Sequence, residues 1–494
     1  MRGLTRWAVI GILIISCGNN AVGPESRPPD CGPPGSQLTM FPDSLRLVVG
    51  SADNAYLDWG CPGPPANVAV GWTIRDQTIA AFGPANPGAP SPYDPQLIHS
   101  LAPGQTFVVV ETAGLLDSVL VVVPDTVVME SIAYVAAGGE ASCAITDGGT
   151  TLCWGAGTGS VLGEPWVDPA IGTCWGSPCS PMPVPRETDL SSVQPMTTHA
   201  CGLDPFGRAS CWGDNYALQL GVPNRGAVYD AVAVGGGKTF TTLTLGRQYT
   251  CGLTSDGDAY CWGDNHAGKL GGNQRNGPIG TPELVSGGLK WVSLYAQAET
   301  TCGVTDAGHL YCWGSFGTSV RTVAGAETCQ VGADKSGPVN EQCAYVPLRM
   351  SLDSGTGPDP IFVQTSGSCV LTSEGGVYCL DDARTRYASV DGLGPIASIS
   401  GGDNHTCGLS AGGAAWCWGS NGDGRLGDGT AEGRSEPVAV TGGHTFTQLA
   451  VGSAHTCGLT DVREVWCWGT NHLGQAGTSI LSEAWAPVKV HGQD

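Results

Sequence analysis

Short apolar runs, broken by small or polar residues, recur along the whole chain. Val68, Val70, Trp72 and Ile74 alternate with small or polar residues, which is typical of a half-buried strand. Similar runs are punctuated by Gly, Pro and Asn, and long helical periodicity is nearly absent. The pattern predicts an all-β protein. At 494 residues the chain is too long for one ordinary core, so we expect more than one domain.

One hairpin-like pattern occurs seven times after residue 140, always with two cysteines ten positions apart. The pairs are Cys143/Cys153, Cys201/Cys211, Cys251/Cys261, Cys302/Cys312, Cys369/Cys379, Cys407/Cys417 and Cys457/Cys467. Six copies place glycine six residues after the first cysteine, where a three-residue hairpin loop needs a left-handed residue. The seventh copy has Arg463 there, which predicts the least favourable turn.

The turn sets the register of the two cysteines. In the first copy the loop is residues 147–149, so Thr146 pairs with Thr150 and Cys143 faces Cys153. Such a site is not hydrogen-bonded, and its Cα atoms approach to about 4.5 Å, which a disulfide can span. Turn chemistry and cysteine spacing therefore both predict a disulfide within each hairpin.

The remaining cysteines of the 21 suggest a location as well as further pairs. Cys31/Cys61, Cys174/Cys179 and Cys329/Cys343 are plausible local disulfides, although no repeated register supports them. So many cysteines would be unusual in a reducing compartment. Cys17 is left without a partner.

The N-terminus has the features of an export signal. Arg2 and Arg6 precede an apolar stretch that is too short to span a bilayer, and the stretch ends at Cys17. Residues 13–17 resemble a bacterial lipobox, in which the cysteine is lipidated and becomes the new N-terminus. We therefore expect residues 1–17 to be a lipoprotein signal peptide and the proline-rich residues 18–36 to be a tether. A plain signal peptide and a buried apolar strand are the alternatives.

Residues 37–125 contain several short strand patterns, which suit a small β-sandwich. Val70-Gly71-Trp72, Asp76 and residues 104–109 resemble the bacterial Ig-like group 2 domain. The resemblance implies an Ig-like β-sandwich. Such a domain is either a spacer or, less commonly, an adhesion module.

Residues 130–494 form a repeat array with a period of about 50 residues and about four short strands per unit. The stretches from His455 to Leu459 and from Cys467 to Asn471, followed by Gly474-Gln475 and Pro487-Val488, resemble the regulator of chromosome condensation repeat family. The resemblance implies a seven-bladed β-propeller. We further expect residues 132–138 to complete the last unit, so that both ends meet in one blade and close the ring.

Several residues of the repeat are candidates for a structural or chemical role. A tryptophan follows the second cysteine in six copies, and we expect these side chains to form the core between blades: Trp154, Trp212, Trp262, Trp313, Trp418 and Trp468. His199, His405 and His455 precede a first cysteine by two positions. They are either hydrogen-bonded structural histidines or, less plausibly, a metal site.

Two glycine-rich stretches have ordinary explanations as turns of the repeat. Residues 421–424 resemble a calcium loop but lack the acidic spacing and final Glu of an EF-hand, and residues 155–159 resemble a phosphate loop but precede no helix. No pair of carboxylates and no Ser/His/Asp spacing argues for catalysis. We expect no metal and no cofactor.

Two units carry insertions, one around Cys174/Cys179 and one between Cys329 and Cys343, whereas unit five is short and lacks Trp-Gly. Both insertions follow equivalent strands, so both should emerge on the same face of the disc. They either mark a binding face or are tolerated surface loops.

Charge and anchoring limit the possible functions. The formal net charge of −22 argues against binding phosphate backbones, so we expect no nucleic-acid partner. We predict a monomeric, exported, lipid-anchored, non-enzymatic protein that binds a protein or a cell-surface polymer. The alternatives are guanine-nucleotide exchange, the activity of the family's namesake, and an enzyme that uses the central channel.

Overall fold

The computed structural model describes eight strands between residues 39 and 123, and then residues 131–157, 161–162, 172–174, 177–186, 188–274, 277–316, 325–334, 337–350, 360–380, 387–478 and 481–493. The chain divides into two compact units, Met1–Thr126 and Val127–Asp494. The expected signal peptide, the tether and Cys17, Cys31 and Cys61 lie outside the described residues, so their assignments stay predictions.

The first unit contains two four-stranded sheets, in the orders β1-β3-β6-β5 and β2-β8-β7-β4. The strands are β1 (Thr39–Phe41), β2 (Ser44–Arg46), β3 (Ala52–Asp58), β4 (Gly71–Ile74), β5 (Ala80–Phe82), β6 (Gln96–Ser100), β7 (Gly104–Thr112) and β8 (Leu115–Val123). Strand β2 runs parallel to β8, and the other described pairs are antiparallel. The assignment of the first unit as an Ig-like domain stays a prediction.

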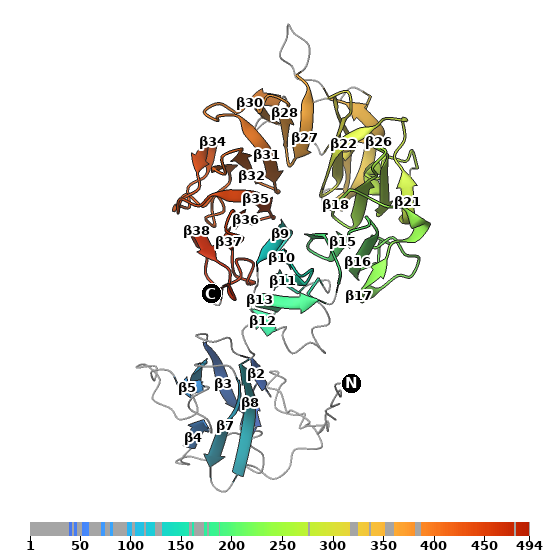
Figure 1. The fold of residues 1–494 in the computed structure, drawn as a ribbon. Coiled ribbons are helices and arrows are strands. Elements are labelled where there is room, and N and C mark those ends of the chain that lie inside the picture. The colour runs from blue at the N-terminus through green and yellow to red at the C-terminus, as the bar shows by residue number, and fades with distance from the viewer. Residues whose placement is uncertain are drawn as a thin grey trace. The chain divides into compact units, whose positions relative to one another are not determined.

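The second unit is a seven-bladed β-propeller, as the repeat predicts. Seven antiparallel sheets follow one another around a ring, and the first strand of each lies at the central channel (Figure 1). Five blades have four strands, whereas blades 1 and 4 have a fifth strand at their outer edge.

The blades take their strands in chain order. Blade 1 contains β9 (Ile132–Gly138), β10 (Ala141–Thr146), β11 (Thr151–Ala156), β12 (Gly172–Cys174) and β13 (Ser177–Arg186). Blade 2 contains β14 (Ser192–Pro195), β15 (His199–Leu203), β16 (Ala209–Asp214) and β17 (Ala227–Ala233). Blade 3 contains β18 (Thr242–Gly246), β19 (Tyr249–Leu253), β20 (Ala259–Gly263) and β21 (Ile279–Leu284). Blade 4 contains β22 (Trp291–Gln297), β23 (Thr300–Thr305), β24 (Leu310–Ser315), β25 (Glu327–Asp334) and β26 (Gly337–Arg349).

The last three blades continue this order. Blade 5 contains β27 (Phe362–Ser366), β28 (Cys369–Thr372), β29 (Val377–Leu380) and β30 (Tyr387–Ser389). Blade 6 contains β31 (Ile396–Gly401), β32 (His405–Ser410), β33 (Ala415–Gly419) and β34 (Arg434–Ala439). Blade 7 contains β35 (Phe446–Val451), β36 (His455–Thr460), β37 (Val465–Gly469) and β38 (Ala484–Lys489). Two short 3-10 helices, η2 (Gly235–Gly237) and η3 (His266–Gly268), lie in loops of blades 2 and 3.

The ring closes differently from the sequence-based expectation, which is wrong on this point. Strand β9 pairs with β10 inside blade 1, and blade 7 obtains all four of its strands from residues 446–489. No strand is shared between the two ends of the described propeller. A repeated sequence does not reveal where one blade ends and the next begins. The pairing of β9 with β10 shows that each blade begins with the strand that precedes its disulfide hairpin. Blades 1 and 7 therefore meet face to face.

The hairpin turns follow the predicted geometry. The Thr146 amide donates to the Thr150 carbonyl oxygen at 3.0 Å, and Gly149 has a φ of 84°. Arg463 adopts the same left-handed conformation, with a φ of 65°. The turn therefore keeps the same form in the seventh copy, although the residue there is not glycine.

Each of the seven hairpins contains the disulfide expected from its turn and its cysteine spacing. The two cysteines face each other directly in the strand register, with Cα–Cα distances of 4.0–4.1 Å. Cys302 and Cys379 are half-buried and the other cysteines of these hairpins are buried. The bonds are Cys143–Cys153, Cys201–Cys211, Cys251–Cys261, Cys302–Cys312, Cys369–Cys379, Cys407–Cys417 and Cys457–Cys467.

The tryptophans that follow the second cysteine are buried between blades. Five are fully buried and Trp418 is 7% exposed. Each of four indoles lies against a glycine of the preceding blade, so that a Cβ added to the glycine would come within 3.0 Å of the indole nitrogen. These pairs are Trp154 on Gly477, Trp262 on Gly221, Trp313 on Gly271 and Trp468 on Gly427. The glycines also have positive φ angles of 66–74°, so both the turn and the close packing require glycine.

Candidate functional site

The interface between blades 7 and 1 contains a buried chain of polar groups. The Nε2 atom of His455 lies 2.8 Å from the hydroxyl of Ser142, and that hydroxyl donates to the carbonyl oxygen of Gln475 at 3.0 Å. The indole of Trp154 donates to the same carbonyl oxygen at 2.9 Å. Because the Ser142 hydrogen goes to Gln475, we infer that His455 donates its Nε2 hydrogen to Ser142.

The same arrangement recurs at three other interfaces, always from one blade to the next. His199 contacts Thr250, whose hydroxyl donates to the backbone carbonyl oxygen of Gln219. His405 contacts Thr456, whose hydroxyl donates to the backbone carbonyl oxygen of Arg425. Tyr249 contacts Thr301, whose hydroxyl donates to the backbone carbonyl oxygen of Lys269. In each case the histidine or tyrosine lies two positions before the first cysteine of its own blade. The serine or threonine lies one position before the first cysteine of the following blade. We call this chain of contacts the interblade relay.

The three histidines are therefore structural, which is the simpler of the two interpretations offered by the sequence. Burial lowers the pKa of His199 and of His405 to about 3 and that of His455 to about 4, so all three rings are neutral at physiological pH. Each ring contacts a different blade interface. Among the described residues there is no group of three or more His, Cys, Asp or Glu side chains that could hold a metal ion.

The loop that resembled a calcium site is organised by the side chain of Asn421. Its Nδ2 group donates to Asp428 and to the carbonyl oxygen of Thr430, and its Oδ1 atom accepts the Leu426 amide at 2.9 Å. Asn215 and Asn265 make equivalent loop contacts in blades 2 and 3. The asparagine thus folds the turn that carries the interblade glycine. The phosphate-like loop lies partly outside the described residues.

A buried lysine, which the sequence analysis did not identify, joins blades 3 and 4. The Lys269 side chain is 1% exposed, and its Nζ atom lies 2.7 Å from Asp264 and contacts Glu299. It also lies 5.3 Å from the centre of the Tyr249 ring. Lys269 occupies the repeat position of Gln219, Arg425 and Gln475, which is the signal that could have identified it.

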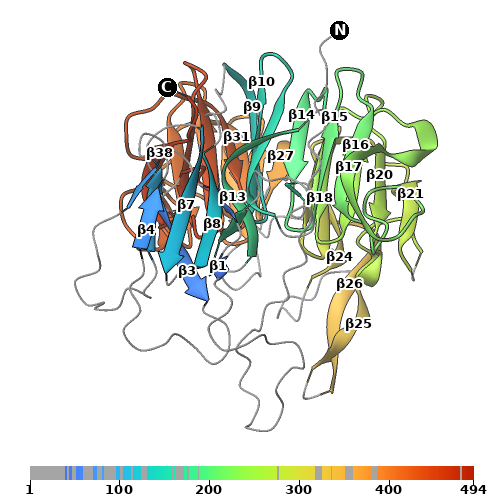
Figure 2. The same cartoon turned by 90° about the horizontal axis from the view of Figure 1, so that it is seen from below.

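Two hairpins extend blades 1 and 4 beyond the same face of the disc. The β12–β13 hairpin begins beyond the C-terminal end of β11, and the β25–β26 hairpin begins beyond the equivalent end of β24. Figure 2 shows β25 and β26 projecting from the disc. These two hairpins are the insertions predicted from the sequence, and we call their side of the propeller the hairpin face.

The base of the β25–β26 hairpin is fixed to the disc. Cys329 and Cys343 form a disulfide and pack with Ala267 of η3, and the Tyr345 carbonyl oxygen accepts the amide of Asn273 from blade 3 at 3.1 Å. In blade 1, Cys179 is disulfide-bonded. The Cys174 side chain lies outside the described part of the chain, so the Cys174/Cys179 pair stays a prediction.

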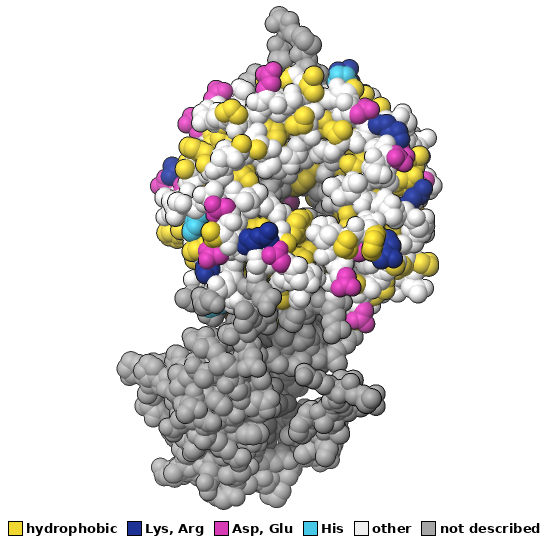
Figure 3. All heavy atoms as spheres, in the orientation of Figure 1, with side chains coloured by type: hydrophobic (Ala, Val, Ile, Leu, Met, Phe, Trp, Pro, Cys, Tyr) yellow, Lys and Arg dark blue, Asp and Glu magenta, His cyan; other side chains and the backbone are white. Residues whose placement is uncertain are grey.

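On the face drawn in Figure 3, acidic and basic side chains are interspersed around the disc, among patches of apolar side chains.

Comparisons with known protein families identify part of the repeated sequence. Two sequence profiles, both described as the Regulator of chromosome condensation (RCC1) repeat, match the chain; one matches residues 240–269, 396–425 and 446–475, and the other matches residues 412–459. The matched segments of blades 3, 6 and 7 are therefore RCC1 repeats. The matched segments contain relay residues of blades 3, 6 and 7 and the turn asparagines Asn265 and Asn421.

Several solved structures show similarity to this chain at low sequence identity. Human WBSCR16 is 18% identical, with a TM-score of 0.41 over 73% of this chain and 82% of that one. Yeast RCC1 is 16% identical, with a TM-score of 0.42 over 73% and 74%. The ectodomain of the receptor kinase CR4 from Physcomitrella patens is 18% identical, with a TM-score of 0.37 over 69% and 74%. No curated protein gives a significant match.

The described residues contain no helix that is both long and apolar enough to cross a membrane.

Because the three histidines are buried and neutral, we expect the free energy of unfolding to fall in acid. An unfolded histidine gains a proton near pH 6.5, whereas the folded rings resist protonation until about pH 3–4, so the stability that they contribute falls as the pH drops through this window. Each histidine should lower the free energy of unfolding by about 1.4 kcal/mol per pH unit within it. Denaturant unfolding at pH 7, 6 and 5 measures the slope.

The matched control replaces all three histidines with tyrosine, the residue that blade 3 uses at the same position. The H199Y/H405Y/H455Y variant should lose less stability per pH unit than the unaltered protein. Equal slopes for the two proteins would contradict the assignment of neutral, buried histidines.

Proposed function

We propose that this protein is an exported, non-enzymatic binding protein and that its hairpin face is where the partner binds. The observation that carries the proposal is the pair of hairpins, which extend blades 1 and 4 beyond the same face of the disc. Insertions gathered on one face of a repeat array are typical of a binding surface.

The β25 strand offers a defined means of recognition. It is the last strand of its sheet, and no described strand pairs with its outer edge. A strand edge of this kind presents backbone donors and acceptors that can pair with an extended segment of a partner. The disulfide at the base of the hairpin and its packing on η3 hold that edge in place, which reduces the entropy lost on binding.

The disulfides support a location outside the reducing cytoplasm. Seven hairpin disulfides and the Cys329–Cys343 bond are typical of exported proteins. We further propose that Cys17 is lipidated, that the membrane is the bacterial cell envelope, and that an Ig-like domain separates the propeller from the anchor. The partner in this proposal is a protein or a cell-surface polymer, and the protein acts as a monomer.

Shortening both hairpins tests the hairpin face. One change replaces residues 330–340 with an Asn-Gly turn and keeps Cys329 and Cys343; the other removes residues 172–179. We expect partner recovery after chemical crosslinking in the native cell envelope to fall at least ten-fold while the propeller keeps its melting temperature within a few degrees, since both changes leave the interblade relay and the tryptophan–glycine pairs in place.

The control variants are F206S and V462S, which replace apolar side chains that are 76% and 69% exposed in hairpin turns of the opposite face. They should recover the partner as the unaltered protein does. If the shortened protein recovers the same species in full, the hairpin face is not the binding face.

The proposed anchor has a direct chemical test. Mass spectrometry of the mature protein should find Cys17 as an acylated N-terminus, because the lipobox-like sequence ends at this residue. C17S should abolish acylation and release the protein from membranes. A mature N-terminus at any other residue would contradict the anchor and leave the test of the hairpin face unaffected.

A further inference from the structure

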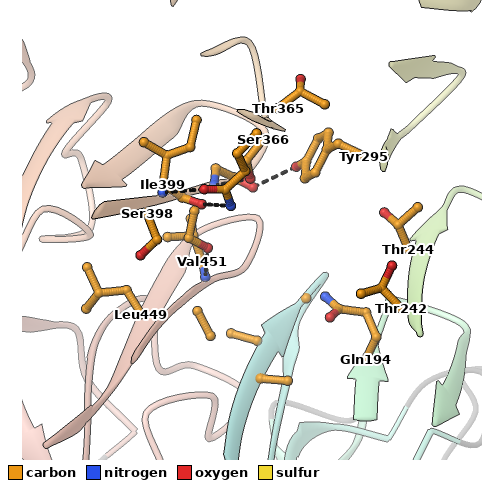
Figure 4. Close-up of a pocket in the computed structure, with 18 of the residues that line it drawn as sticks. Gln194, Thr242, Thr244, Tyr295, Thr365, Ser366, Ser398, Ile399, Leu449 and Val451 are labelled. Atoms are coloured by element: carbon orange, nitrogen blue, oxygen red, sulfur yellow. Dashed lines mark hydrogen bonds between the residues drawn. The ribbon is translucent and has the colours of Figure 1, made fainter. Parts of the chain in front are cut away.

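The central channel of the propeller is a second candidate site, separate from the hairpin face. It encloses about 620 Å³ and is lined by the first strands of all seven blades (Figure 4). This volume lies in the usual range of small-molecule sites, about 300–1,000 Å³.

The channel wall is almost free of charge. Among the described residues that line it, Asp403 alone carries a charged side chain. Serine, threonine and glutamine side chains alternate with Val, Leu and Ala along the strands. A negatively charged ligand would therefore lose its hydration without gaining an ion pair from the described wall, which is unfavourable. A neutral, polar ligand does not meet this penalty.

Most polar side chains of the wall hold neighbouring blades together, which makes the wall rigid. Gln364 of blade 5 donates to the Ile399 carbonyl oxygen of blade 6 at 2.8 Å and accepts the Ile399 amide at 3.0 Å. Gln448 of blade 7 makes the same pair of bonds with Val135 of blade 1, at 2.8 and 3.2 Å. A wall fixed in this way needs little ordering when a ligand binds.

Two tyrosines add fixed aromatic surfaces to the channel. The Tyr295 hydroxyl donates to the Gly401 carbonyl oxygen at 2.6 Å, and the Tyr134 hydroxyl is held by Gln448. Burial raises the pKa of both phenols, so both remain neutral. Both rings are partly exposed, and both residues line the channel.

Three further side chains keep their hydrogen-bonding capacity for a ligand. Gln194 of blade 2 and Thr242 of blade 3 come from neighbouring blades, and Ser398 lies on blade 6 across the channel (Figure 4). Within the described structure these groups make no hydrogen bond to protein. An amide and a hydroxyl can each donate and accept, as the hydroxyl groups of a sugar do.

We propose that the central channel binds a neutral oligosaccharide, with Gln194 and Thr242 as its hydrogen-bonding residues. The absence of charge on most of the described wall, the fixed tyrosine rings and the free amide and hydroxyl groups fit the alternating apolar and hydroxyl surfaces of a sugar. This site does not depend on the hairpin face.

Isothermal titration of the full mature protein tests the proposal. The neutral probes are chitotetraose and maltotetraose, and the charged comparison is tetragalacturonate. At least one neutral probe should bind, and tetragalacturonate should bind at least ten-fold more weakly than that probe. The Q194L/T242V variant should weaken binding at least ten-fold, because it removes two hydrogen-bonding groups while keeping similar side-chain volumes.

The matched control is D403N, which removes the single charge of the described wall and should change the affinity less than two-fold. The protein with both hairpins shortened should bind the probe normally, which separates this site from the hairpin face. Failure of both neutral probes to bind, stronger binding of tetragalacturonate, or unchanged affinity in Q194L/T242V would each overturn the proposal.

Discussion

The contact between neighbouring blades is the constraint on which the rest of this propeller depends. A blade is a small sheet with two faces, and neither face is buried unless another blade packs against it. The repeat provides two kinds of contact at an interface between blades. An indole from one blade lies on a glycine of the preceding blade, and a hydroxyl from the same hairpin donates to a carbonyl oxygen in the same turn. At the four interfaces of the interblade relay the indole, the hydroxyl, the glycine and the turn asparagine occur together, and the carbonyl oxygen of the turn satisfies a hydroxyl that would be costly to bury without a partner.

The disulfides act at a different level, within a blade. Each joins two strands that are already paired by the hairpin, so it stabilises the local fold and contributes little to cohesion between blades. Blade 5 illustrates the difference, since it keeps the Cys369–Cys379 bond but has Leu380 where other blades have tryptophan. Near this blade, the side chains of Tyr295 and Gln297 of blade 4 donate hydrogen bonds to the carbonyl oxygens of Gly401 and Gly402 of blade 6. These contacts link blades 4 and 6 directly.

Local sequence rules predicted some features well and could not predict others. The left-handed glycine and the cysteine spacing determine the hairpin register, because both depend on a few neighbouring residues. Ring closure was predicted wrongly, since a periodic sequence does not fix the position at which it is divided into blades. The relay of His455, Ser142 and Gln475 was missed because its members are far apart in the chain, although a hydroxyl residue before several first cysteines was a visible signal. The polar wall of the channel likewise exists only after seven separate strands have converged.

A comparison within one hairpin tests most directly the claim that cohesion comes from contacts between blades. Trp262 is fully buried against Gly221 of blade 2, whereas Cys251 and Cys261 join strands of blade 3. Denaturant unfolding should show that W262A lowers the free energy of unfolding by about 3–5 kcal/mol. The C251A/C261A variant should lose about 2–3 kcal/mol, as is usual for a disulfide that closes a short loop. A larger loss in C251A/C261A than in W262A would contradict this account.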